Sequence, residues 1–281
     1  MHLNTIKKIH NEQCSLGEGV FFSSKNQRLY WLDINLKNLF ISTLDNQVTQ
    51  FYLPEMAGVI VDVYEEKIFL ASESGICCFD TKKEFWTVLF KSPYQPEHYL
   101  YRANDGCKLS DNCFIFGRMK KKPEKGQGDI IIINKGVANV IYEGITIPNT
   151  FIPLPDENAI LISDSLQQKV FKFFLNIDFS IKSTEVWLDL SDNEATPDGG
   201  CISNDKDIYL ALWGGHAILK LNITGDITGK IELPFPKPTN CVLNEDESLL
   251  YVTSATEGLT QKELAQYPLS GHTIAIPISP P

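Results

Sequence analysis

Short hydrophobic runs separated by polar turns follow one another along the whole chain. Six of them open with one to three small or polar residues, which we call the head: GEGVFF (17–22), GVIVDV (58–63), NDGCKL (104–109), NTFIPL (149–154), DGGCIS (198–203) and NCVLNE (240–245). A turn and a second run follow each: LYWLDI, KIFLAS, CFIFGR, AILISD, DIYLAL and LLYVTS. The heads recur roughly every 40 to 50 residues, the period of a four-stranded propeller blade. The pattern predicts an all-β protein, a six-bladed β-propeller.

Further runs supply the remaining strands of each blade. Third runs such as 38–44 and 129–136, and fourth runs such as 48–54 and 184–190, are separated by polar turn sequences. Helical periodicity is weak, and only 256–268 is expected to carry a helical turn. The repeat leaves no linker, so we expect one domain over residues 1–281.

The two ends of the chain carry strand-like runs that could share a blade. A propeller closes its ring when a strand from one terminus joins a blade begun at the other. We therefore predict that the run NTIKKIH (4–10) pairs beside HTIAIPI (272–278).

Charge and cysteine content exclude several classes of function. The net charge is −10 and the pI is near 5.0, which argues against nucleic acid and anionic membranes as partners. The seven cysteines include no CxxC pair, which indicates reduced thiols rather than disulfides or a zinc site. The N-terminus has no apolar signal region, and no apolar run approaches the roughly 18 residues of a membrane span. We expect a cytoplasmic protein with no membrane partner; the sequence does not fix its oligomeric state.

Three heads carry oxygen ligands suited to a cation. A propeller directs the start of every inner strand at one central channel, where Glu18, Asn149 and Asp198 would converge. Hard divalent cations prefer such carboxylate and amide oxygens, so we predict a metal-binding channel with one divalent cation. Calcium is the first expectation, with zinc, magnesium or manganese as alternatives. The competing interpretation is that Asn and Asp at strand starts only cap turns.

The third head adds candidate substrate-binding groups. Arg102 precedes Asn104 by two residues, which places both on the same side of an extended chain. A guanidinium and an amide together suit hydroxyls and a developing oxyanion; alternatively, Arg102 only pairs with a neighbouring carboxylate. We expect Asp105 to be a turn residue, Gly58 to leave space for substrate, and Asn240 to complete the polar ring.

With these residues assembled, the chain resembles the senescence marker protein/gluconolactonase/regucalcin family over essentially its full length. The motifs that carry the resemblance are LGEG (16–19), YRANDGCKLSDNCFIFGRM (101–119), PNT (148–150) and PDGG (197–200). The resemblance implies a six-bladed propeller with one divalent cation, bound by Glu18, Asn149 and Asp198. It also implies that Arg102 and Asn104 bind a small-molecule sugar lactone. Asp198 would act as general base for lactone hydrolysis or orient the attacking water.

One segment departs from the family pattern. The basic stretch KKKPEKGQGD (120–129) is expected to be an exposed loop, and its first three lysines stand where the family often has acidic residues. Three lysines near the channel mouth would favour an anionic lactone. Two other functions stay open: a phosphotriesterase or other esterase at the same site, or a non-catalytic calcium-binding regulatory propeller.

Overall fold

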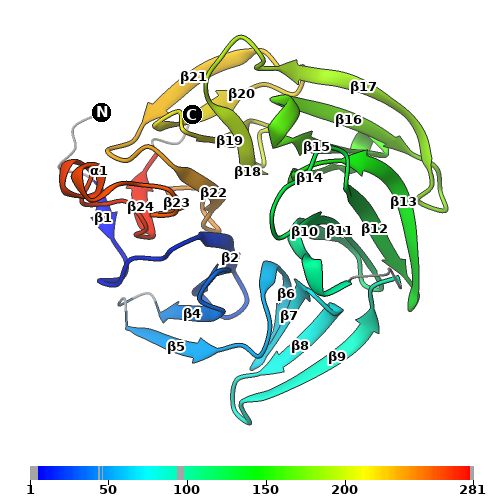
Figure 1. Ribbon diagram of the computed structural model, residues 1–281, viewed down its shortest axis with the longest axis horizontal. Coiled ribbons are helices and arrows are strands. Elements are labelled where there is room, and N and C mark those ends of the chain that lie inside the picture. The colour runs from blue at the N-terminus through cyan, green and yellow to red at the C-terminus, as the bar shows by residue number, and fades with distance from the viewer. Residues whose placement is uncertain (1–5, 44, 46, 94–97, 279–281) are drawn as a thin grey trace. The chain divides into compact units, whose positions relative to one another are not determined.

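The structure is a computed structural model that describes residues 6–43, 45, 47–93 and 98–278. Within these residues, 24 strands form six antiparallel sheets of four strands each. Three sheets belong to each of two compact units, unit 1 (Met1–Tyr52 with Glu194–Pro281) and unit 2 (Leu53–Asn193). Figure 1 labels most of the strands of both units.

Unit 1 contains three sheets and a short helix. Its elements are β2 (Gly17–Ser23), β3 (Arg28–Asp33), β4 (Asn38–Thr43) and β5 (Val48–Tyr52); β18 (Thr196–Ile202), β19 (Ile208–Trp213), β20 (Ala217–Leu221) and β21 (Ile227–Glu232); and β22 (Pro238–Leu243), β23 (Leu249–Ser254), α1 (Gln261–Gln266), β24 (Ile274–Pro277) and β1 (Lys7–Lys8). The first strands of its sheets are neighbours, with β22 in contact with both β2 and β18.

Unit 2 repeats the same plan. Its strands are β6 (Ala57–Tyr64), β7 (Lys67–Ser72), β8 (Gly75–Asp80) and β9 (Phe85–Lys91); β10 (Tyr101–Ser110), β11 (Cys113–Lys120), β12 (Gly128–Asn134) and β13 (Val137–Ile145); and β14 (Pro148–Leu154), β15 (Ala159–Asp164), β16 (Lys169–Leu175) and β17 (Ile181–Asp189). The first strand β10 contacts both β6 and β14.

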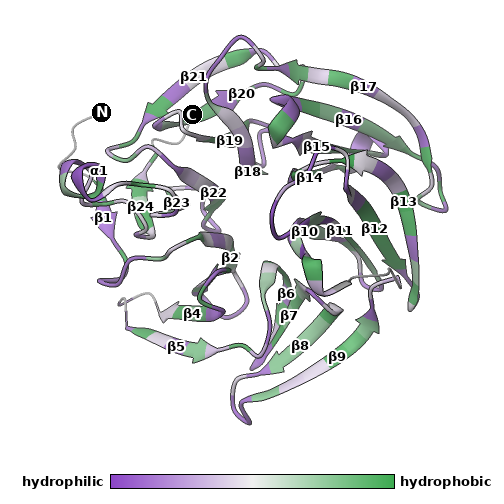
Figure 2. Cartoon of the chain, viewed as in Figure 1, coloured by the Kyte–Doolittle hydropathy of each residue, from purple (hydrophilic) through white to green (hydrophobic). Residues whose placement is uncertain are grey.

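The hydrophobic core lies between neighbouring sheets of each unit. In unit 1, Trp31 and Phe40 of one sheet pack with Tyr251 and Ala275 of the next, and the Trp31 and Phe40 rings stack with centroids 5.2 Å apart. In unit 2, β12 is buried along nearly its whole length, whereas the last strand of a sheet, such as β17, is mostly exposed. Figure 2 accordingly shows most hydrophobic colour on the strands and most hydrophilic colour in the turns.

Each first strand carries a β-bulge close to its head. The register between first and second strands shifts between Glu18 and Phe21, Ala57 and Val59, Ala103 and Gly106, Asn149 and Ile152, Pro197 and Gly200, and Pro238 and Asn240. Two of the bulges contain a residue with positive φ, Gly19 (57°) and Thr150 (62°). A bulge interrupts the two-residue alternation of a strand and redirects side chains. The fold therefore places an irregular backbone at all six heads.

The predicted pairing of the chain ends is confirmed within the described residues. Lys7 and Lys8 of β1 pair with Ala275 and Ile274 of β24. The next residue, Ile9, donates its backbone N–H to the Thr273 carbonyl at 2.9 Å, and its side chain is buried in the core of unit 1. Residues 4 and 5 of the predicted run lie outside the described residues.

Deletion of residues 1–10 is expected to destabilise the protein strongly. The deletion removes the β1 ladder and the buried Ile9 side chain, whose burial alone contributes about 1.5–3 kcal/mol. Together with the lost backbone hydrogen bonds, each worth roughly 1 kcal/mol, we expect a Tm decrease of about 10 °C in a thermal melt. The control replaces Lys7 and Lys8 by serine, which keeps the backbone pairing because both side chains are exposed. An unchanged Tm in the deletion variant would contradict the role of β1.

No helix in the described part of the chain has the length and apolar character needed to cross a membrane.

Candidate functional site

The heads of unit 1 form a buried polar cluster. Glu18 of β2, Asp198 of β18 and Asn240 of β22 are all buried. Asn240 Nδ2 donates to Glu18 Oε2 at 3.4 Å, and the same oxygen accepts from the Gly19 backbone N–H at 3.0 Å. On the other side, a Cβ built on Gly199 would lie 2.2 Å from Asn240 Cγ, so the residue after Asp198 directly touches Asn240. Unit 1 therefore brings the two predicted carboxylate ligands to either side of the strand that carries Asn240.

The heads of unit 2 form a continuous chain of hydrogen bonds. Arg102 Nη1 donates to Asn104 Oδ1 at 2.5 Å, and Asn104 Nδ2 donates to Asn149 Oδ1 and to the Pro148 carbonyl, both at 2.9 Å. Asn149 Nδ2 in turn donates to Ser165 Oγ at 3.1 Å. Arg102, Asn104 and Asn149 are buried. The expected common side of Arg102 and Asn104 is confirmed, and Asn149, the third predicted ligand, is directly bonded to Asn104.

Asp105 is not the turn residue that the sequence suggested. It lies inside β10, where its carboxylate accepts from the backbone N–H groups of Gly106 at 2.8 Å and of Phe151, in β14, at 3.2 Å. Burial raises the pKa of this carboxyl to about 6, although the backbone hydrogen bonds oppose the shift. Asp105 thus joins the bulge of β10 to the bulge of β14, which carries Asn149.

The expectation that Gly58 leaves space for substrate is corrected by its packing. A Cβ at Gly58 would lie 2.2 Å from the Asn104 carbonyl oxygen and 2.5 Å from that of Ala103. The missing side chain is therefore required by the close approach of β6 to β10, and the glycine supports the backbone that carries Asn104.

The basic segment forms the predicted exposed loop only over residues 121–127, because Lys120 ends β11 and the buried Gly128 and Asp129 begin β12. Two of its lysines are paired. Lys120 Nζ lies 2.8 Å from Glu124 Oε2, and Lys121 Nζ lies 2.8 Å from Glu73 Oε1. Both positive charges are partly offset by these carboxylates. The loop alone is thus weaker support for an anionic substrate than the sequence suggested.

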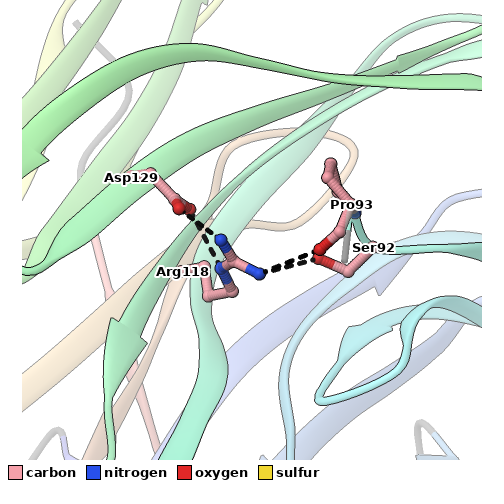
Figure 3. A network of polar contacts seen from close by, with 4 residues as sticks. All are labelled: Ser92, Pro93, Arg118 and Asp129. Carbon is pink, nitrogen blue, oxygen red and sulfur yellow. Dashed lines mark hydrogen bonds and ion pairs between the residues drawn. The ribbon is translucent and has the colours of Figure 1, made fainter. Parts of the chain in front are cut away.

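A buried ion pair lies next to the start of β10. It joins Arg118 of β11 to Asp129 of β12. Arg118 Nε donates to Asp129 Oδ1 at 3.1 Å and its Nη2 contacts the other carboxylate oxygen, while Nη1 donates to Ser92 Oγ at 3.4 Å and to the Pro93 carbonyl at 3.3 Å (Figure 3). The guanidinium also lies 5.2 Å from the ring centroid of Tyr101 and borders a cavity of about 330 Å³. Burial raises the pKa of Asp129, and Arg118 opposes that shift. Arg118 therefore contacts both the segment after β9, at Ser92 and Pro93, and the first residue of β10, the strand that carries Arg102.

Comparison with known proteins decides the family. The model of the SMP-30/gluconolactonase/LRE-like region matches residues 16–256. The chain belongs to the SMP-30/gluconolactonase/LRE-like family. It is similar to an L-arabinolactonase from Azospirillum brasilense, with 26% identity over 92% of this chain and 86% of the relative. It is also similar to a 6-deoxy-6-sulfogluconolactonase from Pseudomonas putida, with 26% identity over 99% of this chain and 96% of the relative.

A solved structure of this family supports the fold. Regucalcin from Agrobacterium tumefaciens, described as a calcium-binding protein, matches with a TM-score of 0.89 and 25% identity over 96% of this chain and 92% of its own. The predicted fold class, an all-β six-bladed propeller, is confirmed, and the six sheets are its blades. The predicted enzyme class, a lactone-hydrolysing enzyme of the gluconolactonase family, is confirmed by the matches to named lactonases.

Sequence reasoning missed several residues that support the candidate site. Ser165 accepts a hydrogen bond from Asn149, and Thr150, the residue after Asn149, adopts a positive φ that a β-branched residue rarely tolerates. The Thr150 hydroxyl lies 2.9 Å from that of Ser163, and both are fully buried. The available sequence signal was only the three polar residues at 163–165 that follow a hydrophobic run.

Proposed function

We propose that this protein is a divalent-metal-dependent hydrolase that opens a sugar lactone to the free acid, with residues 1–281 acting as one propeller domain. The observation that carries the proposal is the hydrogen-bonded chain from Arg102 through Asn104 to Asn149. It joins two predicted substrate-binding groups to a predicted metal ligand. A cap at a strand end would need only a bond to the local backbone, whereas this chain joins side chains of β10 and β14.

The proposed ligands of the cation are Glu18, Asn149 and Asp198. The donor set fits a hard divalent cation, because it offers two carboxylates and one amide oxygen, all on buried side chains. Asn149 Nδ2 is held by Ser165 and its Oδ1 accepts from Asn104, so the amide orientation is fixed. Calcium is the first candidate, with zinc, magnesium and manganese as alternatives. The chemistry that such a cation supplies when bound is polarisation of the lactone carbonyl.

Arg102 and Asn104 would bind and orient the substrate. The bonds from Arg102 Nη1 to Asn104 Oδ1 and to the Ala103 carbonyl, 3.0 Å away, hold the guanidinium in one orientation. A guanidinium and an amide fixed in this way can bind the sugar hydroxyls and the negative charge that develops on the carbonyl oxygen. Preorganised donors of this kind lower the barrier because they need no rearrangement during the reaction.

Asp198 would orient the attacking water or accept its proton. The water oxygen bonds to the lactone carbonyl carbon, and the carboxylate of Asp198 orients that water or accepts its proton. The ester C–O bond of the ring then breaks, and the proton passes to the released ring oxygen to give the hydroxy acid. The two roles of Asp198, base or orienting group, predict the same loss when the carboxylate is removed.

The identity of the lactone is a further part of the proposal. The relatives are named for neutral L-arabinolactone and for a sulfonated gluconolactone, so neutral and anionic sugar lactones are both substrates to test. The paired state of Lys120 and Lys121 removes part of the reason for favouring an anionic substrate on the basic loop.

Metal removal tests the proposal directly. Chelated and dialysed protein should hydrolyse a panel of five- and six-carbon aldonolactones at near the background rate, because the carbonyl loses its polarising group. Separate addition of calcium, magnesium, manganese and zinc should restore turnover with at least one cation. The measurement is the initial rate of acid release, compared with the rate without protein.

Three outcomes would change the proposal. Full activity of the metal-stripped protein would contradict metal dependence. Tight metal binding without turnover of any lactone would direct the test to organophosphate and carboxylic esters, and turnover there would support the esterase alternative. Metal binding without turnover of any substrate would support a calcium-binding regulatory protein.

A further inference from the structure

A lysine and a tryptophan lie at the edge of unit 1 where the heads are found. Lys237 immediately precedes β22 and stands three residues before Asn240. Trp213 is the last residue of β19 and pairs with Thr196, the first residue of β18, two positions before Asp198. Both side chains therefore start from the edge at which first strands begin and second strands end.

The ammonium group of Lys237 is held in place by an aromatic ring and a carbonyl. Its Nζ lies 4.8 Å from the ring centroid of Trp213 and donates to the Glu257 carbonyl oxygen at 2.6 Å. A Cβ built on Gly258 would lie 3.0 Å from Nζ, so the chain also packs closely from that side. Both Lys237 and Trp213 are half-buried. A cation over a tryptophan face is attracted by the electron density of the ring, which favours this position of the ammonium group.

The nearby carboxylates are engaged elsewhere. Glu257 Oε2 accepts from Asn35 Nδ2 at 2.6 Å, and the carboxylate of Glu263 accepts from the backbone and hydroxyl of Thr260 at the start of α1. In the described part of the chain, no carboxylate lies within ion-pair distance of Lys237 Nζ. An ammonium carries three N–H donors, of which the Glu257 carbonyl takes one. Burial lowers the pKa of Lys237, and the charges of Glu257 and Glu263 act on it only at longer range, so the site holds a positioned ammonium group without a direct carboxylate partner.

We propose that Lys237 binds an anionic substituent of the substrate, such as a phosphate, sulfonate or carboxylate on a sugar lactone, and that Trp213 positions its ammonium group. This proposal rests on the proposed lactonase function and adds the substrate class. An oxyanion would complete the hydrogen bonding of the ammonium and neutralise its charge. The partly buried setting strengthens that attraction relative to an exposed lysine.

The test compares neutral and anionic lactones in the complete metal-loaded enzyme. Wild type, Lys237→Met and Lys237→Arg are assayed on gluconolactone and on two anionic lactones, 6-phosphogluconolactone and glucaric acid 1,4-lactone. We expect Lys237→Met to lower kcat/KM for the anionic lactones at least 10-fold through KM, with little change on gluconolactone, and Lys237→Arg to retain most of the preference. The matched control is Lys230→Met, which removes an exposed lysine of unit 1.

A second measurement separates this proposal from the lactonase proposal. Binding of the product acids, 6-phosphogluconate and gluconate, is measured by calorimetry in wild type and Lys237→Met. Preferential binding of 6-phosphogluconate that disappears in Lys237→Met supports the anion site, even if no lactone is hydrolysed. Equal losses on neutral and anionic ligands, or no preference in wild type, would overturn it. Equal Tm values of the variants exclude loss of the fold as the cause.

Discussion

Replacement of Asp198 by alanine is expected to abolish lactone hydrolysis while the fold survives. The carboxylate is proposed to bind the cation and also to orient the attacking water or accept its proton. One substitution therefore removes two interactions that stabilise the transition state. Loss of a single group of this kind lowers kcat on the order of 10³-fold or more. The measurement is kcat and KM for a lactone at saturating metal, together with a thermal melt.

Two further variants make the Asp198 result specific. Asp198→Asn keeps the shape of the side chain and removes the charge, and it should lose nearly as much activity as the alanine variant. The matched control is Asp226→Ala, which removes an exposed carboxylate in a turn of the same unit and should leave kcat within about twofold. Full activity of Asp198→Ala, with normal metal binding, would refute both roles assigned to this residue.

The strands could be predicted because hydrophobic spacing alone defines them. The second runs LYWLDI and LLYVTS coincide with β3 and β23 to within one residue, since a buried strand of about six residues is bounded on both sides by polar turn residues. The helical turn expected within 256–268 is α1, which begins after the capping residue Thr260. The hydrophobic spacing and the polar turn residues therefore predict where each strand ends and the chain reverses direction.

The geometry of the heads could not be predicted from spacing. A bulge adds a residue to one strand, and alternation in a single sequence does not show which residue is left unpaired. The third blade illustrates the difference: its first strand begins at Tyr101, whereas the pattern placed the head at Asn104. The register shift that follows Ala103 leaves Asn104 and Asp105 outside the regular pairing with β11, which the spacing did not show.

Two residues show why roles at the heads depend on contacts distant in sequence. Gly58 appeared to leave room for a ligand, yet the backbone of β10, more than 40 residues away, occupies that position. Asp105 appeared to belong to a turn, yet it accepts a hydrogen bond from Phe151 in the next sheet. In both cases the contacting residue comes from a neighbouring sheet, and the local sequence pattern does not show which residue that is.

The same dependence on packing leads to a large expected effect of a single substitution on stability, at the buried pair of Arg118 and Asp129. Both residues are at most 4% exposed, and the carboxylate accepts two bonds from the guanidinium. Asp129→Ala leaves the guanidinium buried without a counter-charge, and breaking such a pair destabilises a protein by about 3–5 kcal/mol. We expect a Tm decrease of roughly 6–12 °C in a thermal melt.

Substitution of both partners distinguishes a buried charge from a cavity as the cause. The double variant Arg118→Met with Asp129→Leu removes both charges and keeps much of the apolar volume, so it should recover most of the lost stability. The control in the same blade is Glu124→Ala, which breaks the exposed pair with Lys120 and should change the free energy of unfolding by less than about 1 kcal/mol. If Asp129→Ala and Glu124→Ala lower the Tm equally, the buried pair does not stabilise this sheet. Because Arg118 also holds Ser92 and Pro93 ahead of β10, loss of activity in Asp129→Ala at a temperature where it remains folded would link the pair to the position of Arg102.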